Sequence, residues 1–321
     1  MKSITELRDI IEYQLENLTL PNVPKNLYDP IKYVLSIGGK RTRPALTLIA
    51  HQLFNNKLKK SYMPALAVEL FHNFTLIHDD IMDRAIIRRN KKTVHEKWDN
   101  NIAILAGDAM LIQAYKLLSH SEEAVLKDLI LTFNDTAIKV CEGQQLDMDF
   151  QFRHDVTVVD YLTMIEYKTA YLLASALVIG GITAFASIEE RRLLFDFGIN
   201  IGIAFQLKDD LLDVFGKTDT FGKEIGGDIR MNKKTILYLQ ALELANRDQK
   251  EKLEYYFSHS EDINKKVEEV KKIFTDLSIP LFVEEKMKEY HEKAIQSLNL
   301  IKSENKDPLF LFTEQLFDRN T

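Results

Sequence analysis

PALAVELFHNFTLIHDDIMD, residues 64–83, decides the fold class and points to the chemistry of this 321-residue chain. Its apolar residues are spaced as in a helix, and Glu69 is its only carboxylate before the end. There the stretch closes with three carboxylates, Asp79, Asp80 and Asp83. It is therefore predicted as a long helix that ends in an acidic cluster.

The rest of the chain follows the same helical pattern. The chain has only 12 Gly and 7 Pro, too few turn residues for an all-β sandwich or barrel, and no segment alternates strictly with period two. We therefore predict one all-α domain over residues 1–321. Further helices are predicted over residues 4–18, 46–54, 101–118, 122–149, 160–186 and 189–215, and Thr157 with Asp160 resembles an N-terminal capping box. An extended connection is predicted at the three prolines of 21–30. Further connections are predicted at the polar break 55–61, the basic stretch 84–92, and the Gly-rich stretch 215–233, which we expect to act as a mobile lid.

The amino-acid composition excludes several classes of protein. The chain is 45% hydrophobic and 28% charged, which is typical of a folded globular protein, and its net charge of −6 does not favour a nucleic-acid binder. Its one cysteine, Cys141, excludes an internal disulfide and a cysteine-built metal site. The N-terminal residues form an amphipathic pattern without an apolar secretory core, so we expect a cytoplasmic protein.

One uncharged run is long enough to cross a membrane. It covers residues 169–188, between Lys168 and Glu189. The run contains two glycines, several hydroxyl side chains and five alanines, so a buried helix or helix pair is the preferred interpretation and a membrane span the alternative.

The acidic cluster has a second copy, Asp209, Asp210 and Asp213, at the end of FQLKDDLLD (205–213). In each copy the first and third aspartates are four residues apart, hence neighbours on one helix face. Such close carboxylates repel one another unless a cation neutralises them, and oxygen-only ligands suit Mg²⁺. The pair of clusters predicts helices that line a shared cavity and hold metal ions against a diphosphate.

A diphosphate also requires cations from the protein. GGKRTRP (38–44) supplies Lys40, Arg41 and Arg43 near the start of a helix, and Arg88 and Arg89 follow the first aspartate cluster. The guanidinium group matches two phosphate oxygens at once, and a lysine adds a point charge. Alone, either patch would indicate solvated surface or nucleic-acid contact. Beside two aspartate clusters, diphosphate binding is the better interpretation.

This ordered set of motifs resembles the trans-isoprenyl diphosphate synthases, or polyprenyl synthetases. The resemblance implies an all-α isoprenoid-synthase bundle around a central cavity, a homodimer without a membrane span, and three Mg²⁺ ions. It covers roughly residues 33–237. The motifs are GGKRTRP (38–44), DDIMD (79–83), RR (88–89), GQ (143–144), KTA (168–170), FQLKDDLLD (205–213), GK (222–223) and NKKT (232–235).

The resemblance also implies residue roles. Asp79 and Asp209 belong to the catalytic set, together with Lys168, Thr169 and Gln206. All six aspartates, Asp79, Asp80, Asp83, Asp209, Asp210 and Asp213, match metal ligands. Arg88, Lys168, Thr169, Gln206, Lys223 and Lys233 match the allylic diphosphate site, and Lys40, Arg43, His72 and Arg89 match the isopentenyl diphosphate site. Asn90 and Lys92 stand where the family often has Gly and Pro, which leaves the geometry of that loop open.

The reaction implied is a Mg²⁺-dependent prenyl transfer by ionisation, condensation and elimination. Phe74, five residues before Asp79, matches the residue on which the growing chain stops, with Phe71 as a second barrier and small Thr75 beside it. These features resemble short-chain synthases, whose products have about C15 to C20, without deciding between farnesyl and geranylgeranyl diphosphate. The alternative is a non-catalytic subunit of a heteromeric synthase, and it is disfavoured because all six aspartates are intact.

Overall fold

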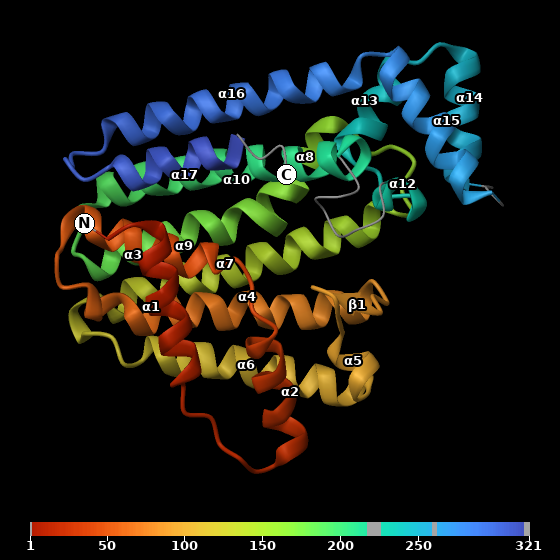
Figure 1. Cartoon of the computed structure of the whole chain (residues 1–321). Helices are drawn as coiled ribbons and strands as arrows, with labels where there is room; N and C mark the ends of the chain where they lie inside the picture. The colour runs from red at the N-terminus through yellow and green to blue at the C-terminus, as the bar shows by residue number, and fades with distance from the viewer. Residues whose placement is uncertain (1, 217–225, 259–261, 318–321) are drawn as a thin grey trace. The chain divides into compact units, whose positions relative to one another are not determined.

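The computed structural model describes residues 2–216, 226–258 and 262–317. Within these residues the chain is helical, and its only strands are β1 (Ile87–Arg88) and β2 (Lys91–Lys92) (Figure 1). The all-α prediction is therefore confirmed. Two compact units share the chain. Unit 1 comprises Met1–Asp135, Ser175–Phe195 and Ile301–Leu309, and unit 2 comprises Thr136–Ala174, Asp196–Leu300 and Phe310–Thr321.

Unit 1 is built around α4 (Tyr62–Met82), which packs against α1, α3 and α6. Every residue from 64 to 71 is buried, so this half of α4 is covered on all sides. The other elements of unit 1 are α1 (Ile4–Glu16), α2 (Lys25–Ser36), α3 (Thr42–Phe54), the 3₁₀ helix η1 (Leu58–Ser61), β1, β2, α5 (Val94–Lys97) and α6 (Asn100–Leu118).

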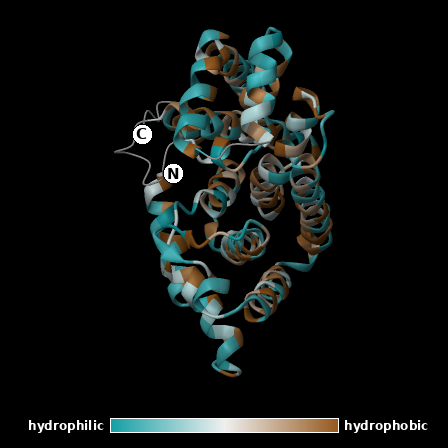
Figure 2. Cartoon of the chain, turned by 90° about the vertical axis from the view of Figure 1, so that its right-hand side faces the viewer, coloured by the Kyte–Doolittle hydropathy of each residue, from teal (hydrophilic) through white to brown (hydrophobic). Residues whose placement is uncertain are grey.

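Unit 2 has its own apolar core, which includes the fully buried side chains Leu253, Val270 and Phe274. Its elements are α8 (Val158–Ile165), the π-helical turn η2 (Glu166–Ala170), α12 (Gly227–Arg230), α13 (Ile236–Leu244), α14 (Arg247–Ser258), α15 (Ile263–Asp276) and α16 (Ile279–Leu300). Residues of both units belong to α7 (Glu123–Phe150), α9 (Tyr171–Thr183), α10 (Ile188–Phe215) and α17 (Asp307–Phe317). Several helices of the chain carry both apolar and hydrophilic residues (Figure 2), as their sequence periodicity predicts.

Two predicted connections are partly regular. The proline-rich stretch 21–30 was predicted to be extended, but α2 starts right after Pro24 and contains Pro30. Burial of Pro30 and of Ile31 offsets the one backbone hydrogen bond that a proline inside a helix cannot donate. The basic stretch 84–92, predicted as a loop, contains the antiparallel pair β1–β2, in which Arg88 is opposite Lys91.

The helix predicted over residues 160–186 is interrupted. It consists of α8, the π turn η2 and α9, and it ends at Thr183. Because no glycine or proline marks η2, the sequence contains no local signal for this turn. The capping box predicted at its start is present, since Thr157 and Asp160 exchange hydrogen bonds.

By length and composition, two segments could cross a membrane, residues 158–183 and α6. The first includes much of the run singled out above, whereas α6 was not singled out. Of the most apolar part of 158–183, 61% is buried inside the protein, which supports the interpretation as core helices. The lid predicted over residues 215–233 falls partly on 217–225, which lie outside the described residues; after them, residues 227–230 are helical rather than loop.

Candidate active site

The first aspartate cluster lies at the C-terminal end of α4. Asp79 and Asp80 are in its last turn, and Asp83 is the residue that caps it. The negative end of the helix dipole disfavours carboxylates here. Asp80 is only 4% exposed, and burial raises the pKa of its carboxyl group, although Arg88 opposes this rise by donating from Nε to Oδ1 at 2.7 Å. The cluster is therefore a place where cations are strongly stabilised.

The β1–β2 hairpin presents the two arginines. Its turn residues, Arg89 and Asn90, both have left-handed backbones, with φ of 51° and 59°. Tight hairpin turns of this kind favour Asn or Gly, so Asn90 fits a position where the family often has Gly. The side chain of Arg89 donates to the carbonyl of Gly38, and this contact joins the hairpin to the GGKRTRP loop.

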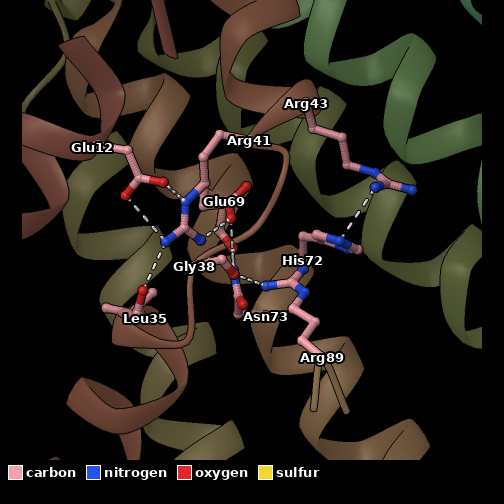
Figure 3. A network of polar contacts seen from close by, with 9 residues as sticks. All are labelled: Glu12, Leu35, Gly38, Arg41, Arg43, Glu69, His72, Asn73 and Arg89. Atoms are coloured by element: carbon pink, nitrogen blue, oxygen red, sulfur yellow. Dashed lines mark hydrogen bonds and ion pairs between the residues drawn. The ribbon is translucent and has the colours of Figure 1, made fainter. Parts of the chain in front are cut away.

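Arg43 and His72 meet beside this contact (Figure 3). Nη1 of Arg43 lies 3.2 Å from Nε2 of His72. Burial, and then the positive charges of Arg43 and Arg89, hold the pKa of His72 well below its usual value. His72 is therefore neutral, and its Nε2 can accept the hydrogen bond from Arg43.

Of the predicted isopentenyl diphosphate residues, the structure thus brings together Arg43, His72 and Arg89, and Lys40 is exposed on the same loop. Arg41 differs from its neighbours. Its place in GGKRTRP predicts a cation that complements a diphosphate, but Arg41 is 3% exposed and its guanidinium is bound to Glu12 and Glu69. That interpretation of Arg41 was wrong.

The second aspartate cluster lies near the C-terminal end of α10. Asp210 is 2% exposed and accepts hydrogen bonds from the hydroxyl of Tyr161 and from Nε2 of Gln206, the latter at 2.9 Å. Burial, and then the negative charges of Asp228 and Asp209, raise the pKa of Asp210 well above its usual value. A cation at this carboxylate would relieve the same repulsion.

Around Asp210 there is a pocket of about 170 Å³ in unit 2. Lys168 lies on its wall and pairs with Asp147, with Nζ 2.5 Å from Oδ2. Thr169 donates to Oε1 of Gln206 at 3.2 Å, so these two side chains and Asp210 form a continuous hydrogen-bonded chain. The pocket is lined by Asp147, Tyr161, Met164, Ile165, Lys168, Thr169, Gln206, Asp210, Asp228, Lys233, Lys234 and Thr235.

The π turn η2 carries Lys168 and Thr169, and Gly143 on α7 allows it to lie close. A Cβ atom on Gly143 would stand 2.7 Å from Cα of Lys168 and 2.8 Å from the carbonyl carbon of Tyr167. Only a glycine fits such an approach of two backbones. The GQ motif at 143–144 therefore has a structural reason, which is to let α7 support the pocket wall.

Three polar residues of this pocket lie outside the motifs identified in the sequence, namely Asp147, Tyr161 and Asp228, while Lys234 and Thr235 belong to the NKKT motif but had no assigned role. Asp147 follows the GQ motif by one helical turn, and this spacing was the only available signal. Asp228 donates its backbone N–H to Oδ2 of Asp213 at 2.9 Å, a contact that no sequence pattern marks.

The residues predicted to limit the product length make aromatic and hydrogen-bond contacts. Phe71 is buried, with ring centroids 5.5 Å from Phe74 and 5.2 Å from Phe133, and the hydroxyl of Thr75 donates to the carbonyl of His72. Phe71, Phe74 and Thr75 lie on the aspartate helix α4 itself, but their role as a chain-length stop stays a prediction. Lys223 lies outside the described residues.

The acidic residues fit Mg²⁺ by their chemistry, because both clusters offer only carboxylate oxygens at the negative ends of helices. Among the described residues, no three His, Cys, Asp or Glu side chains already surround one point. Asp80 and Asp210 are instead bound to Arg88, Tyr161 and Gln206, so metal binding would require these carboxylates to exchange or share their present donors.

Comparison with known proteins gives consistent matches. The polyprenyl synthetase family model matches residues 24–277. A geranylgeranyl diphosphate synthase of Sulfolobus acidocaldarius is 36% identical over 95% of this chain and 92% of its own. A geranylfarnesyl diphosphate synthase of Natronomonas pharaonis is 36% identical over 74% of this chain and 75% of its own. A solved structure of a geranylgeranyl pyrophosphate synthase is 44% identical, covers 100% of both chains and superposes with a TM-score of 0.95.

Proposed function

Because this chain belongs to the polyprenyl synthetase family, we propose that it is a trans-prenyltransferase that joins isopentenyl diphosphate to an allylic diphosphate. The allylic substrate is dimethylallyl, geranyl or farnesyl diphosphate, and the product is a short-chain all-trans prenyl diphosphate of farnesyl or geranylgeranyl length. The observation that carries this proposal is the pocket of unit 2, where Lys168 and Lys233 stand beside the buried carboxylate of Asp210. Cations next to acidic metal ligands suit a metal-bound diphosphate.

The first step breaks the allylic C–O bond and leaves a diphosphate and an allylic carbocation. We assign Arg88, Lys168 and Lys233 to stabilise the negative charge that grows on the leaving diphosphate. Lys168 and Lys233 already lie on the wall of the unit 2 pocket, so they need not move into it when the charge develops. When bound by the two aspartate triplets, Mg²⁺ supplies Lewis-acid stabilisation of the same charge. Lys223, which lies outside the described residues, is proposed to join these cations.

The second substrate is held by the cations of unit 1. Arg43 and Arg89 offer planar forks that match phosphate oxygens, and exposed Lys40 adds a point charge. Neutral His72 accepts from Arg43 and keeps the guanidinium in a fixed orientation. These residues fix the diphosphate so that the isopentenyl double bond can be directed at the carbocation.

Condensation forms a carbon–carbon bond between the isopentenyl double bond and the allylic cation. The new cation then loses a proton to an oxygen of the departed diphosphate, so no side-chain base is required. Thr169 donates a hydrogen bond to Gln206, and Gln206 donates one to Asp210. These two hydrogen bonds hold the dipoles of the side chains in place near the reacting carbons. Fixed dipoles need no reorganisation when the charge develops.

The whole chain is proposed to act as one catalytic domain in a cytoplasmic homodimer with three Mg²⁺ per subunit. Support for a homodimer comes from α6, where the aliphatic side chains of Ile104, Leu105 and Ile112 are exposed. Light scattering on the purified protein measures the number of subunits directly. Nothing in the site or in the relatives favours a non-catalytic subunit.

The activity test uses the purified protein with Mg²⁺, isopentenyl diphosphate and each allylic starter in turn, with products identified by mass spectrometry. We expect prenyl diphosphates of farnesyl to geranylgeranyl length, and none when a chelator is in excess. A Lys168→Met variant, which keeps the length of the side chain without its charge, should lose most of the turnover. Absence of product from every starter would overturn the proposed function.

A further inference from the structure

Arg41 is a buried cation inside the loop that carries the isopentenyl diphosphate residues. Lys40 precedes it, Arg43 follows two residues later, and only Arg41 of the three is fully enclosed. Its backbone is left-handed, with φ of 44° and ψ of 36°, a conformation that residues other than glycine rarely adopt. The loop therefore takes its shape against a local preference, and something must hold it.

The guanidinium of Arg41 makes contacts with three separate segments (Figure 3). Nε donates to Glu12 at 2.8 Å and Nη1 donates to Glu69 at 2.6 Å, while Nη2 donates to the carbonyl of Leu35 at 2.7 Å and to the second oxygen of Glu12 at 3.3 Å. These segments are α1, the end of α2 and α4. All three nitrogens of the guanidinium therefore donate to protein acceptors.

Glu69 extends this network toward the substrate residues. It lies on α4 one turn before His72, and Asn73 donates to the same Oε1 at 3.0 Å. Its negative charge also opposes the effect of burial on the pKa of Arg89. The carboxylate therefore supports two arginines, the buried Arg41 and the hairpin Arg89.

The loop that Arg41 fixes makes direct contact with the substrate residues. The carbonyl of Gly38 accepts from Arg89, and a Cβ on Gly39 would lie 2.7 Å from Nη1 of the same arginine. At the other end of the loop, Arg43 reaches His72. A movement of the loop would therefore disturb both arginine positions at once.

We propose that Glu12, Arg41 and Glu69 form a positioning triad that presets Arg43, His72 and Arg89 for isopentenyl diphosphate, without contact between Arg41 and the substrate. The proposal rests on the proposed function and deepens it. It gives a role to α1, which supplies Glu12 and lies before residues 24–277, the part matched by the family model.

The test compares Arg41→Lys and Glu12→Gln with the wild-type enzyme. Lysine keeps the charge but cannot reach both carboxylates with a planar fork. We expect Arg41→Lys to raise KM for isopentenyl diphosphate about tenfold or more, with a smaller rise for Glu12→Gln. KM for the allylic substrate and kcat at saturation should each change less than about threefold.

Glu12→Gln separates positioning from direct binding. If Arg41 bound the substrate itself, removal of a competing carboxylate would leave KM for isopentenyl diphosphate unchanged or lower it. If Arg41 positions its neighbours, the same change raises KM. An unchanged or lowered KM in Glu12→Gln would overturn the proposal, and so would equal losses for both substrates in Arg41→Lys.

Arg191→Lys is the matched control, because Arg191 is another unit 1 arginine that binds a carboxylate (Asp128, 2.6 Å) and a backbone carbonyl (Ala186, 2.9 Å). It should leave both KM values unchanged. Calorimetric titration with isopentenyl diphosphate in a chelator measures the same loss of affinity without turnover. A wild-type protein that binds this ligand but makes no product would overturn the proposed function, while the variants would still test the triad.

Discussion

The close approach of α7 to the π turn makes a sharp prediction for Gly143→Ala. The new Cβ would lie 2.7 Å from Cα of Lys168, whereas ordinary van der Waals contact begins at 3.4 Å. For this pair of atoms alone the backbones must separate by 3.4 − 2.7 = 0.7 Å, and the backbone nitrogen of Lys168 would stand closer still, so the full displacement is larger. Both neighbours are main chain, so no side-chain rotation can supply it.

The displacement acts on the residues that bind the diphosphate. Asp147 lies one turn after Gly143 on α7 and holds Nζ of Lys168 at 2.5 Å. Overpacking costs about 3 kcal/mol at the upper end, and the better helix propensity of alanine returns about 1 kcal/mol, so we expect a net loss of about 2 kcal/mol. A misplacement of this size near reacting groups should lower kcat about 10- to 100-fold.

The assay combines steady-state kinetics with urea unfolding followed by circular dichroism. Gly181→Ala is the control, since its Cβ would meet only the flexible end of Leu194, at 2.9 Å, which can move aside. It should change neither kcat nor stability by much. A Gly143→Ala enzyme with wild-type kcat and wild-type stability would refute the reasoning that this contact positions Lys168.

Four further predictions use other parts of the chain. Asp79→Ala should nearly abolish turnover. The melting temperature of the metal-free protein should stay equal or rise, because a carboxylate at the negative end of α4 is removed. Turnover by the wild-type enzyme in excess chelator would contradict the metal requirement. Lys40→Ala should raise KM for isopentenyl diphosphate about 10- to 100-fold, and should raise KM for the allylic substrate less. Lys233→Ala should instead raise KM for the allylic substrate more. Equal effects on both substrates would reject the assignment of two separate sites. Phe74→Ala should shift the products, measured by mass spectrometry, to longer chains, and an active variant with unchanged products would exclude Phe74 as the stop. Burial lowers the pKa of fully buried His51 from 6.5 to about 4, so on acidification the unfolded chain binds a proton at a higher pH than the folded protein does. The free energy of unfolding should therefore fall by about 3 kcal/mol as the pH drops from 6.5 toward 4. Urea unfolding of the wild type and of His51→Phe measures this fall, and parallel pH profiles of the two proteins would contradict it.

Features that depend on near neighbours along the chain could be predicted from the amino-acid sequence alone. Helical spacing predicted the long helix that ends in Asp79 and Asp80, and its bounds agree with α4 within two residues at the start. The same local rule predicted the second cluster at the end of α10 and the capping box at Thr157. Such patterns can be predicted because residues three and four apart meet on any helix, whatever surrounds it.

The different roles of similar residues, by contrast, depend on the packing of distant segments and could not be predicted. Arg41 and Arg43 are two positions apart in one basic motif, yet one is enclosed by carboxylates and the other reaches His72. The π turn that carries Lys168 has no marker in its own sequence. Both outcomes depend on groups far away in the chain, because burial and hydrogen bonding are decided by whichever segments pack nearby, and a local pattern does not contain that information.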